Sequence, residues 1–305
     1  MPSFKDTLRS WRRRLKAHLP YVRRREHRVL QRKYAELIEA LDGGASPASE
    51  ARLKFVKPLP ADLGGEVCLF VTYADTPRIK PHVVAHAMRL IDARIEVVLI
   101  VNTELPPDAL TIDPTLLERT RAIAIRQNLG YDFGAWAHLL ALCPGMERWS
   151  RLFLVNDSIV GPLDPTAFER MLARIRTSQA DVVGLTEALL PRRHLQSYFL
   201  AFGPRALRGG AVGRVFGRVR NWPDKGQVID IHESRLTALL EAEGLRCEAL
   251  FPSLSGDPLS SDDTSLRWAE LVRAGFPYLK TRVIASHPGN PQIEAWLEAY
   301  GAATR

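Results

Sequence analysis

The stretch RLFLVNDSIVGPLDP, from Arg151 to Pro165, joins an apolar run to a polar turn. Leu152–Val155 are all apolar, as in a buried strand, and Asn156, Asp157 and Ser158 follow directly before a Gly-Pro pair. A polar turn at a strand end explains such a break, but an amide, a carboxylate and a hydroxyl can also hold a cation or a ligand hydroxyl. The segments on either side decide between these two interpretations.

Strand-like and helix-like segments alternate around this stretch. Asp113-Pro114 has the pattern of a capped short helix. Continuous apolar strands that alternate with helices of about ten or more residues indicate a parallel α/β sheet covered by helices. We expect strands at 66–73, 95–103, 121–128, 151–157 and 180–187, and helices at 80–93, 132–143 and 165–175.

Polar residues follow each expected strand at its carboxyl end. Ligands of parallel α/β sheets bind beyond those ends, so side chains from different strands can meet in one cleft. Each residue alone is more simply a turn or cap residue, as Asp132 is at a helix start, but their convergence favours a binding site. The set comprises Tyr73, Asp75, Asn102, Thr103, Gln127, Asn128, Gly130, Tyr131, Asp132, Asn156, Asp157, Ser158, Thr186 and Glu187.

The composition is that of a globular protein in a reducing compartment. Of the 305 residues, 46% are hydrophobic and 25% are charged, and no apolar run approaches the roughly 20 residues that span a bilayer. The N-terminus lacks the apolar segment of a secretory signal. Cys68, Cys143 and Cys247 fit neither a disulfide framework nor a zinc site. We therefore expect a cytoplasmic location.

Positive charge is concentrated in residues 1–42. They contain twelve lysines and arginines against five acids, and so carry +7 of the net charge of +8. We expect a basic amphipathic helical arm over 1–41, a linker of small residues over 42–62 and the main domain over 63–305. The apolar face of the first helical pattern consists of Phe4, Leu8, Trp11, Leu15 and Leu19.

Three roles remain open for this arm. A basic amphipathic helix with aromatic residues can lie on an anionic membrane surface or dock on a partner, which would make the protein peripheral at the inner face of the cell membrane. The arm can equally pack on the main domain with its charges solvated. Nucleic-acid contact is the weakest role, because the rest of the chain is nearly neutral and has no nucleic-acid-binding motif. We expect no nucleic-acid partner.

Two common nucleotide motifs are missing from the sequence. No G-x-G-x-x-G follows the first strand and no G-x-x-x-x-G-K-[ST] occurs, which disfavours dinucleotide and P-loop sites. A carboxylate after the fourth strand, Asp157, suits instead a divalent cation that bridges the diphosphate of an activated sugar. Oxygen ligands favour Mg²⁺ or Mn²⁺, and such a cation would neutralise the leaving diphosphate.

Three segments resemble the rhamnan synthesis protein F family. They are QNLGYDFGAW (Gln127–Trp136), FLVNDSIVGPL (Phe153–Leu163) and SLRWAELVRAGFPYLKTRVI (Ser265–Ile284), the last being similar to the closing segment of that family. The resemblance covers roughly residues 66–290 and leaves out the basic arm. It implies a GT-A-like glycosyltransferase domain, with a mostly parallel sheet covered by helices.

The resemblance also implies ligands. The donor would be a nucleotide-sugar, foremost dTDP-L-rhamnose, and the acceptor a saccharide or a lipid-linked saccharide. Asp157 stands at the position of the metal-binding acidic motif of GT-A enzymes, with one carboxylate rather than two, and His287 is a candidate to complete the metal shell. The expected donor-binding residues are Tyr73, Asp75, Asn128, Gly130, Asp132, Asn156, Asp157 and Ser158.

Inverting transfer needs a base that takes the proton of the acceptor hydroxyl, and a carboxylate near the cleft can serve. The segment HESRLTALLEAEGLRCEALFP, from His232, is similar to the one in which an acidic residue opens a helix in inverting GT-A enzymes. Glu233 is thereby a candidate catalytic base, or simply a favourable acid in a first helical turn. Glu187 is its rival, and Asp262 and Asp263 are weaker ones.

A further strand, expected over His194–Phe202, faces the same cleft, and its Gln196, Ser197 and Tyr198 are candidate acceptor contacts. We therefore predict an inverting transferase that moves a deoxysugar, foremost L-rhamnose, onto a saccharide in surface-polysaccharide synthesis. A non-catalytic assembly or binding module on the same fold is the alternative. A nucleotidyltransferase is disfavoured, because TYADTPRIKP after the first strand contains no glycine.

Overall fold

The structure is a computed structural model that describes residues 45–143, 145–255 and 262–303. The expected basic arm, residues 1–41, lies outside these ranges, so its helices and its docking on a membrane stay predictions. Within the described ranges, no helix combines the length and the apolar character needed to cross a membrane.

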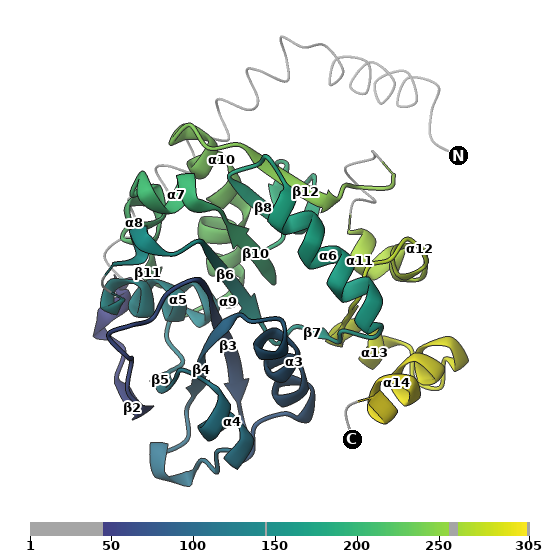
Figure 1. Ribbon diagram of the computed structural model, residues 1–305, viewed down its shortest axis with the longest axis horizontal. Helices are drawn as coiled ribbons and strands as arrows, with labels where there is room; N and C mark the ends of the chain where they lie inside the picture. Colours follow the sequence, from purple (N-terminus) through teal and green to yellow (C-terminus); the bar gives the residue numbers. More distant parts are fainter. Residues whose placement is uncertain (1–44, 144, 256–261, 304–305) are drawn as a thin grey trace, which may run out of the picture. The chain divides into compact units, whose positions relative to one another are not determined.

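A nine-stranded sheet runs through the described part of the chain (Figure 1). Six of its strands are parallel to one another, one runs antiparallel within the sheet and one is antiparallel at an edge. A short ninth strand, β9 (His194–Leu195), pairs with β8. The other strands, in spatial order, are β12 (Cys247–Phe251), β8 (Val182–Ala188), β10 (Phe199–Phe202), β6 (Arg151–Asn156), β3 (Glu66–Ala74), β4 (Glu96–Thr103), β5 (Ala122–Gln127) and β2 (Leu53–Lys57).

The α/β class expected from the sequence is confirmed. β3, β4, β5, β6 and β8 lie within a residue or two of the expected strands, since each is an apolar run that is buried on both faces of the sheet. The antiparallel strand β10 lies between β6 and β8. Its apolar pattern indicates a strand but carries no information about direction, so the sheet is mixed where a parallel one was expected.

The edge strand β2 lies inside the segment 42–62 that was expected to be a linker. It pairs antiparallel with β5, and Lys57 Nζ donates to the backbone oxygens of Leu117 and Thr120 at 2.8 and 2.6 Å. Lys54, on the exposed side of the strand, is typical of a protected sheet edge. Residues 46–57 thus contribute strands to the sheet domain, and the alternating pattern of LKFVK was hidden among small residues and prolines.

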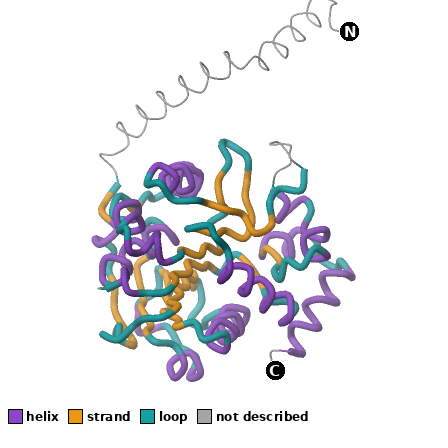
Figure 2. The backbone as a smooth tube through the Cα atoms, turned by 45° about the horizontal axis from the view of Figure 1, so that its top comes forward, coloured by secondary structure: helices purple, strands orange, loops and turns teal. Residues whose placement is uncertain are grey.

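Helices pack on both faces of the sheet, and Figure 2 shows the strands between them. On one face, α3 (Pro81–Asp92) and α6 (Pro165–Thr177) share an apolar core with Phe70 of β3. On the other face lies α5 (Tyr131–Leu142), whose Trp136 Nε1 donates to the Leu69 carbonyl at 3.1 Å. The remaining α-helices are α4 (Pro114–Arg119), α7 (Pro204–Arg208), α8 (Ala211–Phe216), α9 (Lys225–Val228), α10 (Ser234–Ala242), α11 (Asp263–Leu266), α12 (Trp268–Arg273), α13 (Thr281–Ser286) and α14 (Pro291–Ala303).

Two small sheets attach outlying segments to this core. β7 (Ile159–Val160), which follows the Asn156–Ser158 turn, pairs antiparallel with β13 (Leu279–Lys280). β1 (Ser46–Pro47) pairs antiparallel with β11 (Arg220–Asn221). The first pairing carries C-terminal residues to the carboxyl edge of the main sheet, where the polar residues gather.

Candidate functional site

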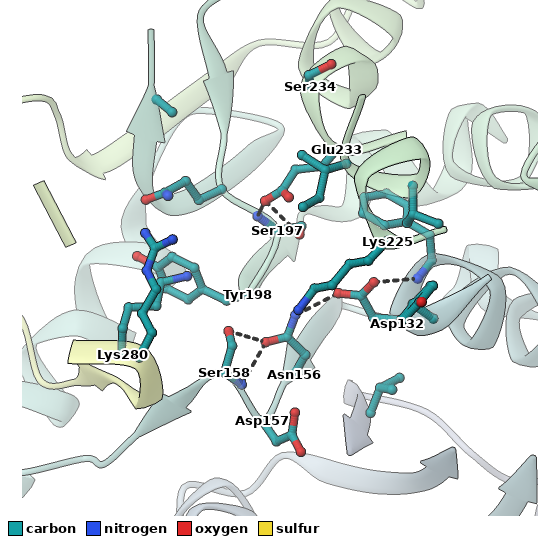
Figure 3. A pocket seen from close by; sticks show the side chains of 18 of the residues that line it. Asp132, Asn156, Asp157, Ser158, Ser197, Tyr198, Lys225, Glu233, Ser234 and Lys280 are labelled. Atoms are coloured by element: carbon teal, nitrogen blue, oxygen red, sulfur yellow. Dashed lines mark hydrogen bonds between the residues drawn. The ribbon is translucent and has the colours of Figure 1, made fainter. Parts of the chain in front are cut away.

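A pocket of about 870 Å³ lies beyond the carboxyl ends of β3, β4 and β6. Many of the predicted residues line it, as do cationic residues from α9, β13 and α13 (Figure 3). The convergence expected from the sheet pattern therefore occurs. The predicted site residues that line the pocket are Tyr73, Asn102, Asn128, Tyr131, Asp132, Asn156, Asp157, Ser158, Gln196, Ser197, Tyr198, Glu233 and Asp262.

The polar turn after β6 is held by its own side chains. Asn156 Oδ1 accepts hydrogen bonds from the backbone N–H of Ser158 at 3.1 Å and from its hydroxyl at 2.7 Å. The Asn156 amide donates in turn to Asp132 Oδ2 at 2.7 Å. On the far side of the turn, the Ser158 carbonyl accepts from the backbone N–H of Thr281 at 2.9 Å. Asn156 thus links the ends of β6 and β5, and fixes the direction of the Asp132 carboxylate.

Asp157 turns toward β3. Its Oδ2 accepts from Thr72 Oγ1 at 2.7 Å, from the Tyr73 backbone N–H at 3.1 Å and from Lys80 Nζ at 2.8 Å. The Lys80 and Asp157 side chains are 36% and 18% exposed, so this ion pair is partly shielded from water. Asp157 Oδ2 therefore accepts three hydrogen bonds, and the negative charge of the carboxylate is already paired with Lys80.

The turn between β5 and α5 orients Asp132. Gly130 and Tyr131 both have left-handed backbone conformations, with φ of 69° and 54°. Glycine adopts that conformation freely, but tyrosine does so at a cost. The Tyr131 carbonyl accepts from the Asn102 amide at 3.0 Å and its hydroxyl donates to the Pro223 carbonyl at 3.3 Å, which holds this conformation. Burial, with a smaller contribution from the Glu233 charge, raises the pKa of Asp132 to about 6.

Arg126, which no sequence pattern marked, supports this turn through hydrogen bonds. The fully buried guanidinium donates to the carbonyls of Leu129 and Ala48, at 2.7 and 3.1 Å, and to Asn221 Oδ1 at 2.9 Å. A Cβ at Gly134 would lie 2.5 Å from the Leu129 carbonyl and 2.6 Å from Asn221 Oδ1. The glycines of GYDFG therefore serve the close packing of this turn.

Glu233 reaches the pocket from an irregular helical segment. α9 continues through a π-helix over Ile229–Glu233 into α10, so Glu233 is not in a first helical turn as one expectation had it. π-turns inserted into helices are frequent at functional sites. Glu233 Oε1 accepts from the backbone N–H and the hydroxyl of Ser197, both at 2.9 Å. This pair of hydrogen bonds fixes the carboxylate while leaving it at the pocket surface.

The segment between β9 and β10 lines the pocket beside Glu233. Ser197 contacts Glu233 as described, whereas Gln196 Oε1 accepts from Thr186 Oγ1 at 2.6 Å and is turned toward the sheet. The Tyr198 hydroxyl also forms a hydrogen bond with Thr186. The ring of Tyr198, rather than its hydroxyl, is therefore the part that contacts Lys280. Lys280 Nζ lies 3.8 Å from the centroid of that ring.

Four of the residues predicted as donor-binding residues, principal candidate bases or metal ligands do not line the pocket. Asp75 is exposed beyond β3, and Gly130 caps α5 against Asn221. Glu187 is buried and engaged by Arg193 Nε at 2.7 Å and by the Ser253 backbone N–H at 3.2 Å. His287 is exposed, with Nδ1 3.0 Å from the Val283 carbonyl. Proximity to a strand end did not reveal which way each side chain points.

The residues around Asp157 do not fit a divalent cation. Lys80 forms an ion pair with this carboxylate, and His287 does not line the pocket. In the described ranges, no group of three or more His, Cys, Asp or Glu side chains is arranged to hold a metal ion. Mg²⁺ and Mn²⁺ need several oxygen ligands. The metal stays a prediction from the resemblance, without support from the donor set.

Three cationic residues of the pocket were missed from the sequence. Lys225 begins α9, Lys280 ends β13 and Arg282 lies in α13 next to Asp262, with which it forms an ion pair. Lysines and arginines are common surface residues, so their identity carried no signal. Lys280 and Arg282 do belong to FPYLKTRVI, part of the segment Ser265–Ile284 that resembles the closing segment of the family.

Fold and site together define an α/β protein with a mixed-charge pocket at the carboxyl edge of its sheet. A family model described as rhamnan synthesis protein F matches residues 97–300. The chain belongs to this family, as the QNLGYDFGAW motif predicted. Membership associates the chain with rhamnan and polysaccharide synthesis and with a glycosyltransferase-like role.

Individual relatives are more distant. The chain is 25% identical over 228 residues to virulence protein VirA of Vibrio anguillarum, covering 64% of this chain and 72% of that protein. It is 30% identical over 141 residues to the uncharacterized protein y4gN of Sinorhizobium fredii, covering 45% and 36%. A crystal structure of a mycobacterial protein matches 71% of this chain and 77% of that one at 13% identity with a TM-score of 0.33, too low to carry an argument.

Proposed function

We propose that the chain is an inverting glycosyltransferase that transfers a deoxysugar, foremost L-rhamnose from dTDP-L-rhamnose, to a saccharide or lipid-linked saccharide in surface-polysaccharide synthesis. The fold would be GT-A-like. The observation that carries the proposal is the placement of the Glu233 carboxylate in a pocket of about 870 Å³ at the carboxyl edge of the sheet, fixed there by Ser197. Family membership supports the polysaccharide context.

The reaction assigned to this pocket is a direct displacement. The acceptor hydroxyl oxygen forms a bond to the anomeric carbon while the bond from that carbon to the diphosphate oxygen breaks. The hydroxyl proton passes to Glu233, and the nucleoside diphosphate leaves with the electron pair. Glu187 is the weaker base, because Arg193 and Ser253 engage both of its oxygens away from the pocket. No step passes through a metal ion.

The donor is assigned to the side of the pocket formed by β3, β4 and the β5–α5 turn. Tyr73, Asn128 and Asp132 line it there. Asn102 lines it as well, and its Oδ1 is buried without a hydrogen-bond partner among the described residues. A buried acceptor of this kind costs free energy unless a ligand donor meets it, and a nucleobase N–H or a ribose hydroxyl would do so.

A panel of nucleotide-sugars tests this proposal. Purified full-length chain should release nucleoside diphosphate, fastest from dTDP-L-rhamnose, when a saccharide acceptor is present. Absence of turnover with every donor would reject the proposal that the chain is an enzyme. If donors then bind by calorimetry without turnover, the chain is the alternative, a binding or assembly module, which the pairing of Asp157 with Lys80 favours.

Association with an anionic membrane surface through residues 1–41 remains a proposal that rests on their charge and apolar periodicity. The full chain should sediment with vesicles that contain anionic lipid, and the chain without residues 1–41 should stay in the supernatant. Equal sedimentation of both forms would reject this role.

A further inference from the structure

Lys280 is placed in the pocket by strand pairing. In β13 it faces Ile159 of β7, which directly follows the Asn156–Ser158 turn. The backbone bond from Thr281 N–H to the Ser158 carbonyl, 2.9 Å long, ties the next residue to the same turn. The aliphatic stem leads Nζ to the face of the Tyr198 ring, 3.8 Å from its centroid. The ammonium group is thus held at a fixed position rather than on a free surface side chain (Figure 3).

This ammonium group lacks a carboxylate partner in the described ranges, since every acidic group of the pocket is directed elsewhere. Asp157 pairs with Lys80, Asp262 with Arg282, and Glu233 with Ser197. Asp132 accepts from Asn156. The Tyr198 ring offers a cation–π contact, which is a weak substitute for an anion.

The isolation of Lys280 has a physical cost. Burial lowers its pKa to about 8, and the nearby Arg282 charge acts in the same direction, whereas Glu233, Asp262 and Asp132 oppose it. A partly buried cation that has no carboxylate in ion-pair contact is stabilised by an anionic ligand. Lys225 and Arg282 line the same pocket, so a ligand with two phosphate groups would meet more than one cationic side chain.

We propose that Lys280 binds the diphosphate of the donor directly, so that this chain holds its nucleotide and neutralises the leaving group without a divalent cation. The inference rests on the proposed function, and it replaces the cation expected at Asp157 with a side chain of the protein. The charge that a metal would supply comes from the ammonium group at the end of β13, with Arg282 and Lys225 beside it.

Titration calorimetry of the full chain tests this inference with dTDP, UDP, GDP and inorganic pyrophosphate, in excess EDTA and with added Mg²⁺ or Mn²⁺. We expect at least one nucleoside diphosphate to bind equally well, within about twofold, under both conditions. Lys280→Met should weaken that binding by about 10-fold to 100-fold, as for a lost charge-assisted hydrogen bond, and should leave affinity for the matching nucleoside unchanged. Lys280→Arg should restore most of it.

The matched control is Lys54→Met in the edge strand β2, which pairs with Asp108 at the surface and should change nothing. Binding that requires the metal, or that survives Lys280→Met, overturns the inference while leaving the glycosyltransferase proposal intact. If no nucleotide binds but pyrophosphate does, in EDTA and through Lys280, the anion site stands and the nucleotide-sugar donor is rejected. If neither binds to the wild-type chain, both fail.

Discussion

The two walls of the pocket treat their carboxylates in opposite ways. In the Asp157 wall, where Tyr73 and Asp157 line the pocket, the Asp157 carboxylate accepts hydrogen bonds from Thr72, from the Tyr73 backbone and from its ion-pair partner Lys80. In the Glu233 wall, formed by Asp132, Ser197, Glu233 and Lys280, the acidic groups receive hydrogen bonds from neutral donors only, and the lysine faces a ring.

This difference between the two walls shows that a carboxylate in a recognisable sequence motif need not be the reactive group. The Asn-Asp-Ser turn is a conspicuous motif in the sequence, yet its carboxylate forms hydrogen bonds that join the end of β6 to β3. A charge whose partner is already present stabilises structure, whereas charges held apart in a partly buried pocket are available to a ligand. The Glu233 wall is therefore where we place the chemistry, and four substitutions test the contrast between the walls.

The largest effect is expected from Glu233→Gln. Glutamine can still accept from Ser197 through its oxygen but cannot take a proton, so turnover should fall by at least about 100-fold while nucleotide affinity stays nearly unchanged. Steady-state kinetics with calorimetry of the same variant measures both. Glu187→Gln is the matched control, because its carboxylate is turned to Arg193. A larger loss of turnover in Glu187→Gln than in Glu233→Gln would exchange their roles.

Asp132→Asn tests how much free energy it costs the folded chain to keep the Asp132 carboxylate ionised in the Glu233 wall. The pKa of Asp132 is raised to about 6 from 3.8 by burial and then by Glu233. Between these two values the native chain binds more protons than the unfolded chain, so the free energy of unfolding falls as the pH rises. Asparagine does not titrate. The stability of the variant relative to wild type should therefore rise across this window by on the order of 2 kcal/mol.

Urea unfolding followed by circular dichroism, at pH values from about 4 to about 7 that bracket the two pKa values, measures this slope. Hydrogen bonds lost in the variant shift the difference in stability by a constant amount, so only its pH dependence matters. A difference that is the same at every pH would mean that Asp132 titrates normally and that the wall carries no such cost.

The sequence predicted much of the sheet but less of this contrast. Apolar runs mark β3, β4, β5 and β6 because burial on both faces demands them, and parallel strands bring their polar ends together. Side-chain direction is decided by tertiary contacts that no local pattern contains. Lys80 and Lys280 are both lysines, and the sequence does not distinguish their roles. In the structure, Lys80 forms an ion pair with Asp157, whereas Lys280 faces the Tyr198 ring.

The same limit applies at the helix before α10. The acidic residue followed by leucines at helical spacing predicted a helix that begins at Glu233, but the chain is already helical from Lys225 and inserts a π-turn. Nothing in KGQVIDIHE distinguishes a π-turn from an α-turn. The strand β2, inside the segment 42–62, was not predicted for another reason, because it is stabilised by pairing with β5 rather than by its own composition.

Asp157→Asn should affect stability rather than chemistry. The variant keeps one acceptor oxygen but loses the ion pair with Lys80, which is partly exposed, so we expect a loss of about 1 to 2 kcal/mol in the free energy of unfolding. Added Mg²⁺ should not shift the melting temperature of the wild type. A rise in melting temperature with Mg²⁺ that is absent from the variant would instead place a cation at Asp157, and would make the two walls alike.

The smallest effect is expected from Lys225→Met. Lys225 lines the pocket at the start of α9 but is exposed, so water and salt screen its attraction for a diphosphate. Affinity for the nucleoside diphosphate should fall by no more than about threefold at physiological ionic strength, and the loss should grow as salt is lowered. Calorimetry at two salt concentrations measures this. If Lys225→Met costs as much as Lys280→Met at both, the diphosphate binds across the pocket mouth, and the isolation of Lys280 is not what selects its position.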